Sequence, residues 1–118
     1  MIGALLALCV VGCSTTQGSF RPLGKVYPPK PADFAVEIFE APSEPQRAFE
    51  RVARLDAHFE KTHFIPTAHA TAIAELQKQA RTVGADAVIE IRETRSRVGE
   101  TFILHVTGIG IHYVEPAH

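Results

Sequence analysis

The stretch that most constrains the fold is residues 80–91, which read ARTVGADAVIEI. Before Gly84 the apolar residues recur every three or four positions, as on one side of a helix, and after it they alternate as in a strand. Glycine readily adopts the left-handed conformation that ends many helices, so Gly84 is expected to be a structural residue at the boundary. The stretch therefore predicts a helix packed back onto a sheet, as in the second half of a β-α-β crossover.

The predicted helix begins after Thr67, whose hydroxyl can accept hydrogen bonds from the free amides of the first turn. A helical projection separates one buried stripe from a polar flank. The stripe consists of Ala72, Ile73, Leu76, Ala80 and Val83, and the polar flank includes Glu75, Lys78, Gln79 and Arg81.

Four segments have the alternation or the β-branched composition of strands. In the last of them the apolar residues change parity near Gly108 and Gly110, where a bulge or bend would return both sets to one core. These two glycines are therefore expected to be structural. The four segments are residues 35–40, 49–60, 86–93 and 101–114.

The order of these elements, β-β-α-β-β, predicts an α+β fold: a two-layer sandwich with one helix packed on a mostly antiparallel four-stranded sheet. The side of the sheet away from the helix would be polar, and it is either solvated or used for assembly. Its side chains would be Glu37, Arg54, Asp56, His58, Glu60, Glu90 and Arg92.

Composition narrows the class of protein. With 118 residues, 46% of them hydrophobic and 21% charged, the chain suits one small domain with an appended segment. The formal net charge of -1, without a basic cluster, argues against nucleic acid as a partner. Both cysteines, Cys9 and Cys13, precede the domain, so neither a disulfide framework nor a cysteine-based zinc site is expected in it.

Residues 1–12, MIGALLALCVVG, carry no charged side chain and have the length of a signal peptide rather than of a membrane span. Residues 10–13, Val-Val-Gly-Cys, resemble the lipobox of bacterial lipoproteins, in which the cysteine thiol carries diacylglycerol and the freed amine is acylated. The resemblance implies that residues 1–12 are a lipoprotein signal peptide and that Cys13 is lipidated. Ordinary secretory cleavage and an uncleaved anchor are the alternatives. In Gram-negative lipoproteins a serine at the next position, here Ser14, implies the outer membrane, facing the periplasm.

Residues 13–33 are rich in proline, glycine, serine and threonine, which predicts an extended linker between the lipid and a domain at residues 34–118. At about 3.1 Å per residue it could hold the domain up to roughly 60 Å from the membrane. Its apolar residues either dock on the domain or a partner, or are scattered along a spacer. They are Phe20, Leu23, Val26 and Tyr27.

Six histidines raise the question of a metal site, for which His58, His63 and His69 are weak candidates near the start of the helix. No two of them have metal-ligand spacing on one helix, so exposed or edge-packed histidines are the simpler interpretation. Asp86 is expected to hydrogen-bond within the turn before its strand. Because the chain has no nucleophile elbow, phosphate loop or fixed carboxylate pair, neither an enzyme nor a cofactor is expected.

The run from Ala80 to Ile89, followed by the hairpin that ends in residues 108–111, GIGI, resembles small bacterial envelope lipoproteins of uncharacterised function. It is more distantly similar to YbjQ-type "putative heavy-metal-binding" domains and to RcsF-like lipoprotein sensors. The resemblance implies an α/β module, which is oligomeric in the YbjQ-type domains and binds a partner in the RcsF-like sensors. The domain lacks the disulfide cysteines of the sensor. We therefore expect a lipid-anchored, non-enzymatic envelope protein that displays a small domain for self-association or protein binding. The alternative is a metal-binding or metal-sensing lipoprotein that uses its histidines.

Overall fold

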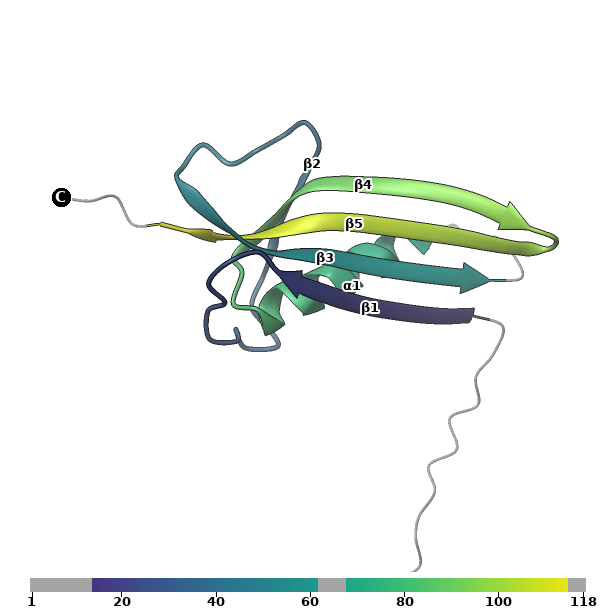
Figure 1. Cartoon of the computed structure of the whole chain (residues 1–118), viewed down its shortest axis with the longest axis horizontal. Helices are drawn as coiled ribbons and strands as arrows, with labels where there is room; N and C mark the ends of the chain where they lie inside the picture. The colour runs from purple at the N-terminus through teal and green to yellow at the C-terminus, as the bar shows by residue number, and fades with distance from the viewer. Residues whose placement is uncertain (1–13, 62–67, 115–118) are drawn as a thin grey trace, which may run out of the picture.

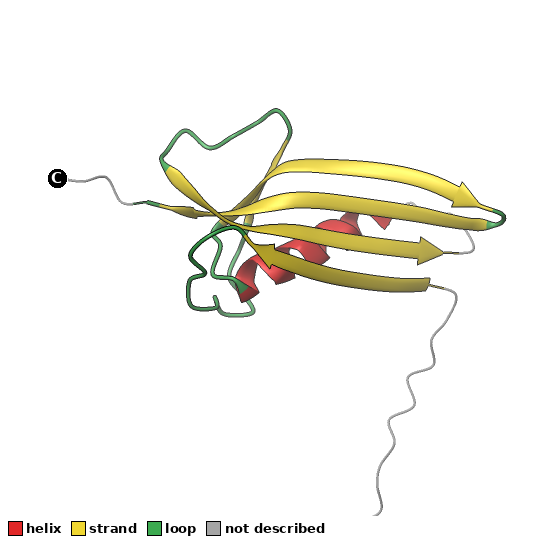
Figure 2. Cartoon of the chain, in the orientation of Figure 1, coloured by secondary structure: helices red, strands yellow, loops and turns green. Residues whose placement is uncertain are grey.

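The structure is a computed structural model that describes residues 14–61 and 68–114. These residues form one mixed sheet with a helix across one face, as Figures 1 and 2 show. The predicted α+β class with a single helix on a sheet is thus confirmed. The elements are β1 (Ser14–Pro22), β2 (Glu37–Glu40), β3 (Phe49–Lys61), α1 (Ala68–Thr82), β4 (Ala87–Val98) and β5 (Thr101–Tyr113).

The strand order in the sheet is β1-β3-β5-β4-β2. β3 and β4 both pair antiparallel with β5, so they run parallel to each other on either side of it. The chain crosses from β3 to β4 through α1, which forms the β-α-β crossover that residues 80–91 predicted. β2 pairs with β4 in parallel, so the sheet is mixed, while its other strand pairs, β1 with β3, β3 with β5 and β5 with β4, are antiparallel as expected.

The predicted four-stranded sheet was incomplete, because Ser14–Pro22, assigned to the linker, forms a fifth strand. β1 pairs antiparallel with β3 over its whole length, from Ser14 opposite Lys61 to Pro22 opposite Ala53. Backbone hydrogen bonds along an open sheet edge can hold a polar segment that has no apolar alternation of its own. The predicted signal peptide and Cys13 lie outside the described residues.

The rest of the predicted linker crosses the end of α1 on its way to β2. The Tyr27 N–H donates to the Val83 carbonyl at 3.1 Å, and the Lys30 N–H donates to the Arg81 carbonyl at 2.8 Å. Tyr27 packs against the core, whereas Phe20, Leu23 and Val26 are exposed. The segment is therefore part of the folded domain. No helix among the described residues is long and apolar enough to span a membrane.

The main core lies between α1 and the sheet. The helix buries its predicted stripe: Ala72, Leu76, Ala80 and Val83 are fully buried, and Ile73 is partly buried against them. Full burial of a leucine or valine side chain contributes about 1.5–3 kcal/mol, so this interface dominates the stability of the fold. The sheet side of the core includes Leu55, Ala57, Phe59, Val88, Ile91, Leu104 and Val106.

The prediction of a bulge or bend in the last strand was wrong. β5 runs without interruption, and the register shifts lie in its neighbours, between Arg51 and Ala53 of β3 and between Ile89 and Arg92 of β4. Glu90, with a φ of 53°, marks the second shift. The two apolar sets of β5 therefore stay on opposite faces of the sheet. The second set packs in a smaller cluster away from the helix, with Ala87, Ile89, Ile111, Phe39, Phe49, Ile109 and Tyr113.

Gly108 and Gly110 face the main core instead of bending the strand. A Cβ atom on Gly108 would lie 2.6 Å from Val88 Cγ1, and one on Gly110 would lie 3.2 Å from Ala85 Cβ. Gly108 leaves the space that Val88 fills, and at Gly110 a Cβ atom would be tight against Ala85, because neighbouring side chains approach the backbone of β5 closely.

Candidate functional site

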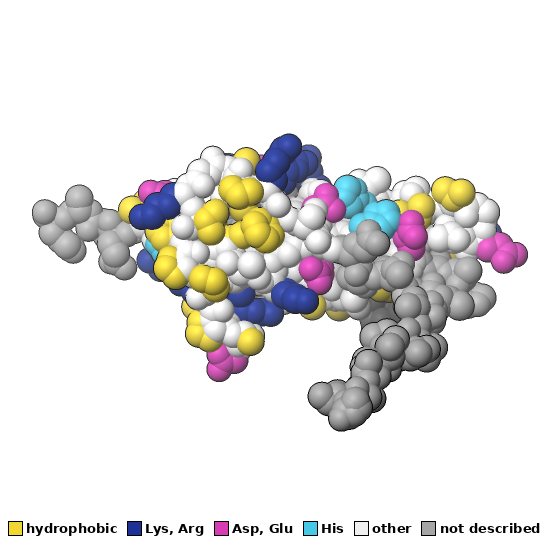
Figure 3. All heavy atoms as spheres, turned by 60° about the horizontal axis from the view of Figure 1, so that its bottom comes forward, with side chains coloured by type: hydrophobic (Ala, Val, Ile, Leu, Met, Phe, Trp, Pro, Cys, Tyr) yellow, Lys and Arg dark blue, Asp and Glu magenta, His cyan; other side chains and the backbone are white. Residues whose placement is uncertain are grey.

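The face of the sheet opposite α1, here named the open face, carries most of the polar residues that the sequence placed there. Side chains of directly opposed residues on neighbouring strands point to the same side, so the register places them together. In Figure 3, histidine side chains lie between acidic ones, with basic side chains close by. The open face includes Ser19 and Arg21 of β1, Arg54, Asp56, His58 and Glu60 of β3, Ile103, His105, Thr107 and Ile109 of β5, and Arg92 of β4.

At the centre of the open face, His58 of β3 is directly opposite His105 of β5. Their ring centroids are 5.9 Å apart with an interplanar angle of 62°. His105 Nε2 lies 2.7 and 2.8 Å from the two carboxylate oxygens of Asp56, and His58 Nε2 lies 3.0 Å from Glu60 Oε1. The two imidazoles are therefore each oriented by a carboxylate, and both are accessible to solvent.

The three metal candidates from the sequence do not come together. His58 lies on the open face, whereas His69 lies in the first turn of α1, on the other side of the sheet, and His63 falls outside the described residues. Within residues 14–61 and 68–114, no three or more histidine, cysteine, aspartate or glutamate side chains are placed to hold a metal ion. The sequence missed His105 as the neighbour of His58 because only the strand register brings them together.

His69 instead connects the start of α1 to two strands. Its Nδ1 lies 2.6 Å from Glu93 Oε1 of β4, and its Nε2 lies 3.1 Å from Glu40 Oε1 of β2. The hydrogen bond to Glu93 raises the pKa of His69 above its ordinary value. Burial alone would raise the pKa of Glu93, but the hydrogen bonds from His69 and Arg95 outweigh it and lower that pKa. Exposed pairs of this kind contribute at most about 1 kcal/mol, so these contacts add little to the stability of the fold.

Asp86 also makes structural contacts. Its carboxylate accepts hydrogen bonds from the Tyr113 N–H at 2.8 Å and from Lys30 Nζ at 2.9 Å. Burial raises the pKa of Asp86, but these two donors and the nearby His112 outweigh it, so that the pKa is lowered. His112 Nδ1 lies 3.1 Å from the carboxylate without the alignment of a hydrogen bond, and its ring stacks on Tyr27 at 3.7 Å. Asp86 thus joins β4, β5 and the segment that crosses α1.

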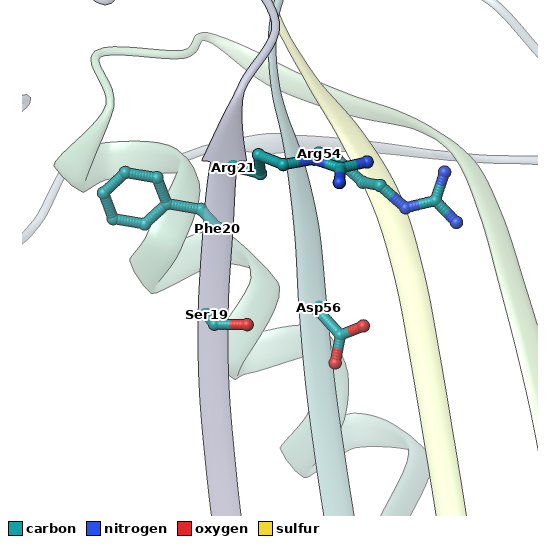
Figure 4. A pocket seen from close by; sticks show the side chains of 5 residues that line it. All are labelled: Ser19, Phe20, Arg21, Arg54 and Asp56. Atoms are coloured by element: carbon teal, nitrogen blue, oxygen red, sulfur yellow. The ribbon is translucent and has the colours of Figure 1, made fainter.

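A second feature of the open face is a hollow of about 300 Å³ at the junction of β1 and β3. It is lined by Ser19, Phe20, Arg21, Arg54 and Asp56, which Figure 4 shows as sticks. Arg21 and Arg54 are directly opposite each other on the two strands. The sequence analysis missed this hollow, because one wall comes from the strand that it assigned to the linker.

Comparison with known proteins supports the fold and part of the expected family. Residues 57–112 match the YbjQ family model, which is described as "Putative heavy-metal-binding". This YbjQ-like segment contains the end of β3, all of α1 and β4, and β5 up to residue 112. It also holds both histidines of the open face.

A solved structure shares the architecture of most of the chain. The crystal structure of the Francisella virulence factor FvfA is similar with a TM-score of 0.59 and 13% sequence identity, over 80% of this chain and 97% of that one. At this identity the similarity shows a common fold only. Among curated proteins, none matches the sequence.

Proposed function

We propose that this protein is a bacterial envelope lipoprotein without catalytic activity. It is anchored in the outer membrane through Cys13 and faces the periplasm. Its open face is displayed for self-association or for binding an envelope protein. One observation carries the proposal. Strands β1, β3, β5 and β4 present one broad surface opposite the helix, and at its centre four polar side chains are held in two pairs, His105 with Asp56 and His58 with Glu60. Ordered polar groups around apolar residues are typical of non-obligate protein interfaces.

The anchor would hold the domain at the membrane surface. β1 begins at Ser14, the residue after Cys13, and Ser14 is opposite Lys61, at the same end of the sheet as the β4–β5 hairpin (Figure 1). A lipid on Cys13 would therefore place this end of the sheet against the bilayer, without the long spacer expected from the sequence. Burial of each lipid CH₂ contributes about 0.8 kcal/mol, so several acyl chains give stable attachment where one chain does not.

The anchor is tested by fractionating cells and measuring the mass of the mature protein. We expect the wild-type protein in the membrane fraction, with an amino terminus at Cys13 that carries the mass of a diacylglyceryl group and an acyl chain. Cys13→Ser should lose both modifications, whereas the matched variant Cys9→Ser should keep them, because residue 9 lies within the predicted signal peptide. An unmodified wild-type amino terminus would end the proposal of a lipid anchor.

Display for association is tested separately, by light scattering of the purified protein and by crosslinking in cells. An oligomer, or a crosslink to an envelope protein from a position on the open face such as Thr107, is the expected result. A protein that stays monomeric and crosslinks to nothing from Thr107 would contradict the proposed role of this face.

A second candidate function, binding of a divalent transition metal, is favoured by the opposed histidines on the open face and by the description of the family model that matches residues 57–112. Imidazole is a common ligand for zinc, copper and nickel. Two nitrogens do not complete a site, so Asp56 or Glu60 would have to turn from its histidine to the metal.

Calorimetric titration with Zn²⁺ tests this alternative. His58→Gln and His105→Gln are each expected to weaken binding by tenfold or more, whereas His69→Gln, on the other side of the sheet, should leave it unchanged. Equal loss in all three variants, or no heat of binding in the wild-type protein, would rule out a zinc site on the open face.

A further inference from the structure

Three arginines of the open face have no partner among the described residues. In the part of the chain that the structure describes, Arg21, Arg54 and Arg92 have no ion pair or hydrogen bond from their side chains. The other described arginines are engaged: for example, Arg51 Nη2 lies 2.5 Å from Glu90 Oε2, and Arg97 Nε donates to the Gly99 carbonyl at 2.9 Å. The arginines without a partner are therefore concentrated on one surface.

Two of the three are forced together by the fold. Arg21 and Arg54 are directly opposed on β1 and β3, a position in which Cβ atoms are about 4.5–5.5 Å apart and like charges destabilise a sheet. Figure 4 shows that both side chains extend across the sheet toward β5. The two positive charges lie beside the hollow and repel each other. An anion bound between them would relieve this repulsion.

The lining of the hollow specifies the kind of anion. A guanidinium presents a planar fork of donors that matches the oxygens of phosphate, and two forks suit an anion with two charges better than a carboxylate with one. The Ser19 hydroxyl adds a neutral donor at the same wall. Asp56 also lines the hollow. Both of its carboxylate oxygens lie within 2.8 Å of His105 Nε2, so the carboxylate is directed toward the imidazole of His105.

We propose that the hollow between β1 and β3 binds a phosphomonoester group through Arg21 and Arg54, with Ser19 as a further donor. This site adjoins the opposed histidines through Asp56, which lines the hollow and contacts His105, but it uses neither histidine and does not depend on lipidation of Cys13. The phosphomonoester is either a small soluble metabolite or the headgroup of a lipid.

Calorimetric titration of the full-length protein with glycerol 3-phosphate tests the site. We expect a dissociation constant below about 1 mM and a rise in melting temperature on binding, because a ligand that binds only the folded state stabilises it. Arg21→Gln and Arg54→Gln should each weaken binding by about tenfold or more, since each removes a charge-assisted contact. The matched variant Lys78→Gln removes the same charge from the exposed surface of α1 and should bind as the wild type does.

The unliganded variants separate binding from a structural role. Without phosphate, Arg54→Gln should melt at or above the wild-type temperature, because it removes a like-charge contact. A lower melting temperature together with unchanged phosphate binding would show that Arg54 supports the sheet and would overturn the proposal. Equal weakening by Lys78→Gln, or no binding to the wild type at 10 mM phosphate ester, would overturn it as well.

Dihexanoyl phosphatidic acid, a soluble lipid with the same phosphomonoester, distinguishes the two sources. Tighter binding than glycerol 3-phosphate, lost in Arg54→Gln, indicates a lipid headgroup. Equal affinity for both, again lost in Arg54→Gln, indicates a soluble phosphate ester.

Discussion

Gly84→Ala is expected to lower the free energy of unfolding by about 3 kcal/mol, of which 1–2 kcal/mol comes from the left-handed backbone alone. Gly84 has a φ of 75°. A Cβ atom there would lie 2.5 Å from the Pro28 carbonyl oxygen and 2.6 Å from Tyr27 Cβ. The segment that crosses α1 would have to move away, with loss of the hydrogen bond from the Tyr27 N–H to the Val83 carbonyl. Urea denaturation followed by circular dichroism measures the effect.

Gly99→Ala is the matched control, because Gly99 also has a positive φ, of 62°, but no atom lies within 4 Å of its added Cβ. It should lower the free energy of unfolding by the backbone contribution alone, about 1–2 kcal/mol. If both variants lose the same stability, the contact between residue 84 and the crossing segment contributes nothing, and the packing of residues 27–30 on the helix end is not what fixes the glycine.

Gln79→Leu is expected to lower the free energy of unfolding by about 2–3 kcal/mol, because it leaves two backbone groups of β3 without partners. The side chain of Gln79 reaches from α1 to the sheet. Its Nε2 donates to the Asp56 carbonyl at 2.7 Å, and its Oε1 accepts from the Asp56 N–H at 3.1 Å. Gly18 leaves room for this reach, since a Cβ atom there would lie 2.1 Å from Gln79 Nε2.

Lys78→Leu is the control for the second prediction. It places the same side chain at the preceding position of α1, which is exposed, and should change stability by less than about 0.5 kcal/mol. Thermal and urea denaturation of both variants give the comparison. Similar small losses in the two would mean that water replaces the amide at Asp56.

The sequence predicted best the elements whose pattern repeats. The apolar stripe of α1 and the alternation in β3 each place several residues on one side, and the structure buries Leu76, Ala80, Leu55 and Phe59 as expected. Gln79 was the exception in the helix, because it is only 5% exposed although the projection put it among the polar residues. Its burial depends on a partner in another element, which periodicity within the helix does not reveal.

Three features of the open face could not be predicted for a related reason. β1 has no alternating pattern, and it becomes a strand because β3 offers it an edge. The parity change in the last strand is resolved by two packed faces instead of a bulge, since residues of β2 and β3 cover the second set. The opposition of His58 with His105, and of Arg21 with Arg54, follows from strand register alone.

The sequence by itself determined the helix, the glycine that ends it, the crossover to β4 and the polar character of one sheet face, because each depends on the order of neighbouring residues. Only the tertiary structure decided which strand joins the edge, where the register shifts fall and which charged side chains meet. Those outcomes depend on contacts between residues far apart in the chain, whose energies no local pattern encodes.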